Sequence, residues 1–215
     1  MTLRALVPVS TLASAKGRLA GVLTDVERRA LALTTLATVL EAVRDAGGEA
    51  FVLTRDPLVA AEASARAAVI GEDPQAEGLN AQLERAVAQL DGRELLILHA
   101  DLPLANGDAV RRLVEAAPPA RSVTLVRSRD GGTNAMLLRP PGRFPLRYGP
   151  DSARQHEGEA RRAGFRVAFA DVPELSLDLD TPEDLRAFLA LPGAERTPAG
   201  ALLLRWRVLE REEIG

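Results

Sequence analysis

The chain has 215 residues, of which 47% are hydrophobic and 27% are charged, and its formal net charge is −3. This length suits one α/β domain with a sizeable core, and the near-neutral charge argues against a dedicated nucleic-acid binder. The absence of cysteine excludes disulfides, thiolate metal sites and a cysteine nucleophile. No apolar run approaches the roughly 20 residues that span a bilayer. We therefore expect a cytoplasmic protein with neither a nucleic-acid nor a membrane partner.

Short strand-type segments alternate with longer helical segments along the chain. Residues 3–9 predict a buried strand, and Thr24 and Glu27 form a capping box that opens a helix to about residue 43. The further expected elements are strand 50–54, helix 57–65, strand 67–70, helix 80–90, strand 95–99, helix 108–116, strand 122–127, strand 134–139, helix 152–163, strand 166–170 and a last helix from Pro182.

This alternation predicts the fold class. Strands separated by helices favour parallel pairing with right-handed crossovers, so we expect an α/β fold with a single doubly wound, mostly parallel sheet and helices on both faces. The Gly- and Pro-rich interval 128–165 is expected to add an antiparallel excursion on one edge. We assign residues 1–192 to this domain. Residues 193–215 form a C-terminal extension of unknown role, which is an extra strand, a docking tail or a dimer contact.

Three aspartates follow apolar segments where a parallel sheet collects its ligands. Asp101 ends strand 95–99, and Asp178 and Asp180 share parity in an extended segment, so both point to one face. Like charges so placed repel unless a cation neutralises them, and carboxylate oxygens suit Mg²⁺ better than Zn²⁺ in a chain with only two histidines. The structural alternative is that Asp101 caps the next turn, that Asp180 merely precedes the helix cap Thr181 and that Asp178 is solvated.

The segment 10–19 is the expected phosphate-binding loop, because the chain has neither a P-loop nor a G-x-G-x-x-G motif after its first strand. Lys16 is the only lysine, every other basic residue being arginine. Its retention favours a position that needs a compact ammonium group, with Arg18 as a second charge partner. Chance survival on a surface loop is the alternative.

Two further polar segments have both a structural and a functional interpretation. Residues 130–135 form either a plain tight turn or a turn whose exposed backbone N–H groups bind an anion. In segment 148–152, Ser152 is either a simple N-cap or part of an anion site at a helix N-terminus. His156 is expected one turn inside that helix.

Taken together, these motifs resemble the 2-phospho-L-lactate and phosphoenolpyruvate guanylyltransferases of deazaflavin coenzyme F(420) biosynthesis. The resemblance covers about residues 3–190. It rests on Pro8-Val9, Ala15-Lys16-Gly17-Arg18-Leu19, Gly78-Leu79-Asn80, Ala100-Asp101-Leu102-Pro103, Gly131-Gly132-Thr133-Asn134-Ala135, Tyr148-Gly149-Pro150-Asp151-Ser152 with His156, and residues 177–185 around Asp178 and Asp180.

The resemblance implies a nucleotide-diphospho-sugar transferase type of fold, similar to the molybdenum-cofactor guanylyltransferases, and a role for each matched position. By resemblance, Asp101, Asp178 and Asp180 bind Mg²⁺; Thr133, Gly149 and Ser152 hold the phospho-acid; Lys16 and Arg18 face the triphosphate; Gly78 and Asn80 lie on the nucleotide side; and Lys16, Arg18 and Asp101 serve catalysis. Two departures are Ser10, where the family often has lysine, and Ala153, where an aromatic residue often follows the serine.

The expected reaction joins GTP to a phosphorylated three-carbon acid and releases pyrophosphate. Phosphoenolpyruvate is the favoured acceptor and 2-phospho-L-lactate the second, with 3-phospho-D-glycerate also open. The alternatives are another nucleotidyltransferase of the same fold, which would use a sugar phosphate or molybdopterin, and a non-catalytic nucleotide-binding domain. A homodimer is compatible with the sequence.

Overall fold

The computed structural model describes residues 2–13, 15–90, 92–142 and 144–212. Its strands are β1 (Arg4–Pro8), β2 (Glu49–Thr54), β3 (Ala68–Gly71), β4 (Leu95–Leu98), β5 (Ser122–Arg127), β6 (Thr133–Arg139) and β7 (Arg166–Phe169). Its α-helices are α1 (Asp25–Asp45), α2 (Pro57–Ala63), α3 (Gly78–Val87), α4 (Gly107–Ala116), α5 (Ser152–Arg162), α6 (Pro182–Leu189), α7 (Pro198–Arg205) and α8 (Val208–Glu212). Short 3₁₀ turns are η1 (Gly17–Leu19), η2 (Pro173–Leu175) and η3 (Ala194–Arg196).

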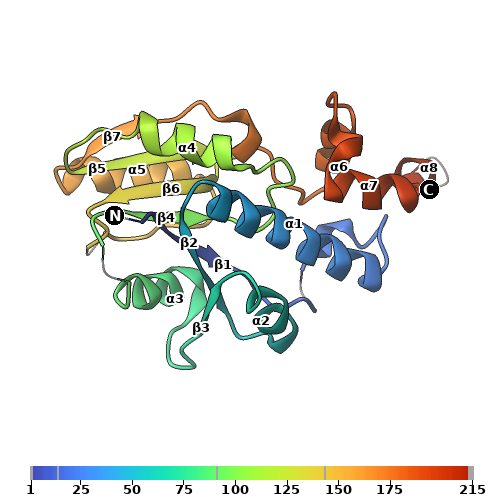
Figure 1. The fold of residues 1–215 in the computed structure, drawn as a ribbon, viewed down its shortest axis with the longest axis horizontal. Helices are drawn as coiled ribbons and strands as arrows, with labels where there is room; N and C mark the ends of the chain where they lie inside the picture. Colours follow the sequence, from blue (N-terminus) through green and yellow to red (C-terminus); the bar gives the residue numbers. More distant parts are fainter. Residues whose placement is uncertain (1, 14, 91, 143, 213–215) are drawn as a thin grey trace.

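The seven strands form one sheet in the order β3-β2-β1-β4-β6-β5-β7, which confirms the expected mostly parallel α/β fold (Figure 1). Only β6 runs antiparallel to its neighbours β4 and β5. The expectation of an antiparallel excursion at an edge is wrong, because β6 lies inside the sheet. The short turn between β5 and β6 permits only an antiparallel hairpin, and residues 133–138 are all buried, as an interior strand requires.

Alternate side chains of the strands enter two cores, one on each face of the sheet. In β1, Ala5 and Val7 pack with α1, α2 and α4, whereas Leu6 packs with α3. The same alternation in β4 sends Leu96 toward the first core and Ile97 toward the second. Because both faces are covered, ligands have access to the sheet only at the ends of its strands.

The C-terminal segment is helical, so the expectation of an extra strand is wrong. Its buried Leu203 and Val208 share a third apolar cluster with Leu31 of α1 and with the segment that follows η1 (Figure 1). Arg211 adds two hydrogen bonds of 2.8 Å to the Glu27 carboxylate. The described part of this segment thus packs against the beginning of α1, and its role stays a prediction.

This docking makes a stability prediction with a matched control. The Leu203 side chain is fully buried and its neighbour Leu204 is 48% exposed. Leu203→Ala leaves a cavity in the tail cluster and is expected to cost about 2–5 kcal/mol of unfolding free energy. Leu204→Ala is expected to change it by no more than about 0.5 kcal/mol. Urea unfolding of both variants checks this, and equal effects would contradict the docked position of α7.

Candidate functional site

The three predicted aspartates meet at the carboxyl end of β4. Asp101 follows that strand, and its carbonyl oxygen accepts a hydrogen bond from the Leu179 N–H at 3.3 Å, which lays the extended segment 177–180 beside it. In that segment Leu177 and Leu179 are buried, so Asp178 and Asp180 face the other way. Three carboxylate oxygens, one from each aspartate, lie within 4.8 Å of one another.

None of these aspartates caps a neighbouring helix with its side chain. The helix after Asp101 is capped by Asn106, whose side chain accepts from the Ala109 N–H. Helix α6 is capped by a reciprocal box between Thr181 and Asp184. No cap therefore depends on Asp101, Asp178 or Asp180, and the Oδ1 atom of Asp101 is buried without a partner among the described residues. A cluster of hard oxygen ligands with an unused buried lone pair fits a divalent cation such as Mg²⁺.

Lys16 lies inside this cluster. Its Nζ is 2.7 Å from Asp101 Oδ2 and 2.9 Å from Asp180 Oδ1, and only 5% of its side chain is exposed. The interpretation of the lone lysine as a chance survivor on the surface is therefore wrong. Burial alone would lower the pKa of Lys16, but the two carboxylates outweigh it and raise the pKa above its usual value, so the ammonium stays charged.

The pKa values of two of the carboxylates, Asp101 and Asp178, shift in opposite directions. Burial favours the neutral form of Asp101, but Lys16 outweighs it and lowers the pKa of Asp101 to about 2. Asp178 has no such partner, and burial together with the charges of Asp101 and Asp180 raises its pKa to about 6. The cluster thus has more carboxylates than its one ammonium group can balance, and this excess acts on Asp178.

A buried polar network occupies the beginning of β6 and α5. The Arg147 N–H donates to His156 Nε2 at 2.8 Å, so His156 Nδ1 carries the proton that it donates to Thr133 Oγ1 at 3.0 Å. Ser152 Oγ donates to the same Thr133 oxygen at 3.1 Å. Burial lowers the pKa of His156 to about 4 and keeps its ring neutral. The Ser152 hydrogen is used in the bond between the two hydroxyl groups. The Thr133 hydroxyl hydrogen is therefore left for another acceptor.

The structure corrects the local interpretation of the turns around this network. The N-cap of α5 is Asp151, at φ 56°, so the interpretation of Ser152 as a simple N-cap is wrong. The Gly131 and Gly132 N–H groups bond to the Ser128 carbonyl and the Asp130 carboxylate within their own turn. This is the plain tight turn of the two alternatives, and those two N–H groups are not available to an anion.

Another predicted acceptor residue, Gly149, lies on the exposed loop before α5. Its φ of 141° is a conformation that a side chain would strain, and a Cβ added there would meet open space. The glycine is therefore required by the backbone conformation of this loop.

The residues predicted for the nucleotide divide into two groups. Gly78, at φ 77°, lines a cavity of about 370 Å³ that also includes Ser10 and Asp101. Asn80 instead pairs with the main chain of Tyr148, donating to its carbonyl at 3.0 Å and accepting from its N–H at 2.7 Å. Asn80 thus ties α3 to the loop before α5. Arg18 is exposed on η1.

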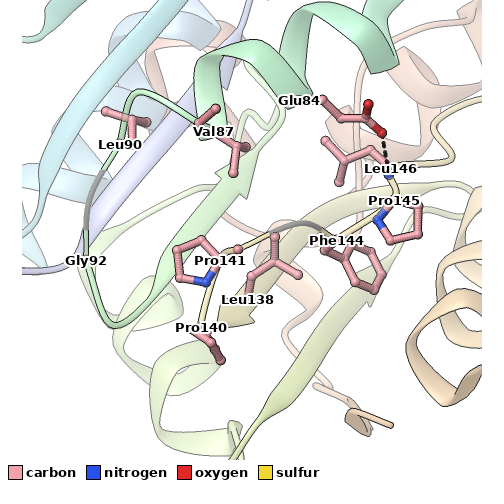
Figure 2. Close-up of a pocket in the computed structure, with 12 residues that line it drawn as sticks. Glu84, Val87, Leu90, Gly92, Leu138, Pro140, Pro141, Phe144, Pro145 and Leu146 are labelled. Carbon is pink, nitrogen blue, oxygen red and sulfur yellow. Dashed lines mark hydrogen bonds between the residues drawn. The ribbon is translucent and has the colours of Figure 1, made fainter. Parts of the chain in front are cut away.

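A larger cavity, of about 730 Å³, lies at the opposite end of the sheet (Figure 2). Its wall residue Leu138 pairs with Leu95 at the start of β4, whereas Asp101 follows the end of that strand. The lining is mostly apolar, and the Glu84 carboxylate there accepts the Leu146 N–H at 3.2 Å. Because the clustered charges lie elsewhere, we assign the chemistry to the smaller cavity beside Asp101.

Sequence reasoning missed several contacts at this edge. It named Lys16 and the aspartates separately but not the ion pairs between them, and it placed His156 without its bond to Thr133. It also passed over Arg55 and Glu72, which line the smaller cavity after β2 and β3. Their position directly behind two predicted parallel strands was the signal that would have found them.

The fold is similar to that of known nucleotidyltransferases. A crystal structure from Desulfovibrio desulfuricans, assigned as a nucleotide-diphospho-sugar transferase, superposes with a TM-score of 0.80 at 17% identity, over 99% of this chain and 98% of that one. The family model described as guanylyl transferase CofC like matches residues 3–200. The chain therefore belongs to this guanylyl transferase family, which confirms the resemblance.

Two relatives show the range of names within the family. A phosphoenolpyruvate guanylyltransferase from Rubrobacter xylanophilus is 40% identical, over 94% of this chain and all of that protein. A 3-phospho-D-glycerate guanylyltransferase from Phenylobacterium zucineum is 32% identical, over 90% of this chain and 93% of that protein.

The raised pKa of Asp178 predicts a pH-dependent gain in stability on its removal. Because the folded protein favours the protonated carboxyl, the wild type loses stability as the pH rises through about 6. Without metal, Asp178→Asn is expected to gain about 1 kcal/mol at pH 7.5, roughly 2–4 °C in Tm, and little at pH 4.5. Thermal unfolding in a chelator measures this at both pH values.

The control for that experiment is Asp171→Asn, which removes an exposed carboxylate. It is expected to leave Tm unchanged at both pH values. A loss of stability in Asp178→Asn at pH 7.5 would contradict the charge excess inferred for the cluster.

Proposed function

We propose that this chain transfers a guanylyl group from GTP to phosphoenolpyruvate and releases pyrophosphate, as one step of deazaflavin coenzyme F(420) biosynthesis. The observation that carries the proposal is the order of groups along one edge of the sheet. The smaller cavity lies at the carboxyl ends of β1, β2 and β3, and the aspartate cluster follows β4. Thr133, which carries the hydroxyl group, is the first residue of β6. A nucleotide on one side and an acidic acceptor on the other would meet at the cluster.

Asp101, Asp178 and Asp180 are the residues that would hold Mg²⁺. The ion would supply positive charge between two polyanionic substrates. Lys16 already provides one positive charge within the cluster through Asp101 and Asp180. Arg18, exposed on η1, supplies a second that can follow the triphosphate as it binds.

The reaction needs little from the protein beyond positioning and charge. An oxygen of the acceptor phosphate attacks the α-phosphorus of GTP, a new P–O bond forms, and the bond to the bridging oxygen of the β-phosphate breaks. Pyrophosphate leaves with that electron pair. The attacking oxygen is already ionised near neutral pH, so no general base is required, in accord with the neutral, buried His156.

The acceptor side is proposed at Thr133 and Ser152, with Gly149 in the loop directly before Ser152. The unused hydroxyl hydrogen of the pair is a donor, and a phosphate or carboxylate oxygen is an acceptor. Phosphoenolpyruvate is the choice that the Rubrobacter xylanophilus relative supports. Among the described helices none has the length and apolar character of a membrane span. A cytoplasmic location and a homodimer stay predictions.

Acceptor-dependent pyrophosphate release tests the proposed reaction. With GTP and Mg²⁺, the wild type is expected to release pyrophosphate on addition of phosphoenolpyruvate, and faster than with 2-phospho-L-lactate or 3-phospho-D-glycerate. Asp101→Asn and Asp180→Asn are each expected to lower the rate by about a thousandfold or more, since charge stabilisation is the main catalytic contribution. Asp171→Asn is the control. GTP binding without turnover would identify a regulatory domain instead.

The acceptor site predicts an effect on KM that a matched pair of threonines can reveal. Thr133→Val keeps the shape of the side chain but removes the hydroxyl, and KM for the acceptor is expected to rise about 10- to 100-fold. Thr124 is also buried on a neighbouring strand, and its hydroxyl has no partner among the described residues. Thr124→Val is therefore expected to leave KM unchanged. An unaltered acceptor KM in Thr133→Val would exclude this site.

A further inference from the structure

The far end of the smaller cavity presents a carboxylate and a guanidinium side by side. Arg55 follows β2 and Glu72 follows β3, and both line the cavity that reaches Asp101. Their strands lie one and two places beyond β1 in the sheet. Glu72 is therefore three strand spacings, roughly 14 Å, from Asp101 along this edge. A nucleoside whose α-phosphate lies at the aspartates would direct its base toward this pair.

The walls of the cavity at this end are apolar. Pro8 and Val9 at the end of β1 and Leu79 at the start of α3 supply apolar lining. Leu79 is 43% exposed, so its side chain is accessible to a ligand in the cavity. Apolar walls that leave one polar edge are suited to a flat heterocycle, because the walls contact its faces and the polar groups read its rim.

Glu72 is free to act as that polar group. Its side chain is 20% exposed, and Arg55 Nε is 3.5 Å from its Oε2, too far for a strong hydrogen bond. The neighbouring Asp73 is already committed, since its carboxylate pairs with Arg85 and accepts the Gln75 N–H. Of these two adjacent acids, only Glu72 faces the cavity.

The loop that carries Glu72 is fixed by a buried glutamine. Gln82 accepts from the Asp73 N–H at 2.9 Å and donates to the carbonyls of Asp73 and Ala76 at 2.7 and 2.8 Å. All three bonds go to the main chain of the loop. The loop therefore needs no ligand to hold its shape, and Glu72 is presented in a preorganised position.

We propose that Glu72 and Arg55 select guanine as the base of the nucleotide. The Glu72 carboxylate accepts hydrogen bonds from N1–H and the N2 amino group of guanine, and Arg55 donates to O6. Adenine presents a lone pair at N1 and a donor at position 6, so it would meet both groups with the wrong polarity. This inference rests on the proposed function, because it assigns the base specificity of the same site.

Analogues that change one atom group at position 2 of the purine test this assignment. Inosine triphosphate lacks the N2 amino group, and the wild type is expected to favour GTP over it in kcat/KM by about tenfold or more. Xanthosine triphosphate has an oxygen at that position. In Glu72→Gln, the amide can donate to this oxygen, so the ratio of kcat/KM for GTP over xanthosine triphosphate is expected to fall by about 100-fold.

The control is Glu77→Gln, which alters an exposed carboxylate in the same loop region that makes no cap hydrogen bond. It is expected to retain the wild-type ratios. Unchanged base ratios in Glu72→Gln would overturn the proposal. If that variant does not fold by circular dichroism, Arg55→Ala takes its place, because the Arg55 side chain is 70% exposed. It is expected to weaken GTP binding about threefold to tenfold while ATP binding stays unchanged, and equal effects on the two nucleotides would overturn the assignment.

The same nucleotides titrated by calorimetry without acceptor separate this proposal from the proposed function. If the wild type binds GTP preferentially, Glu72→Gln loses this preference and no pyrophosphate is released, the base assignment stands and the transfer reaction is excluded. If GTP is turned over without preference over inosine triphosphate, the transfer reaction stands and the base assignment is excluded.

Discussion

The ammonium group of Lys16 lies between the carboxylates of Asp101 and Asp180, and the arrangement of the catalytic edge depends on this contact. Three acidic side chains from two distant segments would repel one another without it. The lysine is almost fully buried, so its charge is compensated only by these partners, and breaking such a pair typically costs about 3–5 kcal/mol. It therefore joins the loop after β1, the end of β4 and the segment before α6 into one unit.

Two kinds of order support that unit. Main-chain hydrogen bonds fix where the segments run, as when Leu179 donates to the Asp101 carbonyl, and capping boxes fix where the helices begin. Asn80 and Gln82 on α3 then use their amides to hold the loops on either side, one toward Tyr148 and one toward Asp73. Helix α3, which packs on one face of the sheet, thus also fixes the two loops of the proposed substrate site.

Most of the fold followed from local pattern, whereas the contacts of the site did not. Short apolar runs predicted the strands, and the Thr24 capping box placed the start of α1 correctly. The interior position of β6 was missed because an apolar run predicts a strand but does not indicate which strands lie beside it in the sheet. The contact between Lys16 and Asp101 spans 85 residues in sequence, and the bond between Thr133 and His156 depends on a ring tautomer. Such pairings exist only after the chain has closed in three dimensions.

The reversed direction of β6 gives the two substrate sides different kinds of construction. The proposed nucleotide side is built on crossovers between parallel strands, which connect the sheet, helices and loops over long stretches of chain. The acceptor side is built on one tight hairpin and the first turn of α5. A few substitutions there would alter acceptor preference and leave base selection intact. Relatives whose names specify different phospho-acids but the same guanylyl group are what such a divided design would produce in evolution.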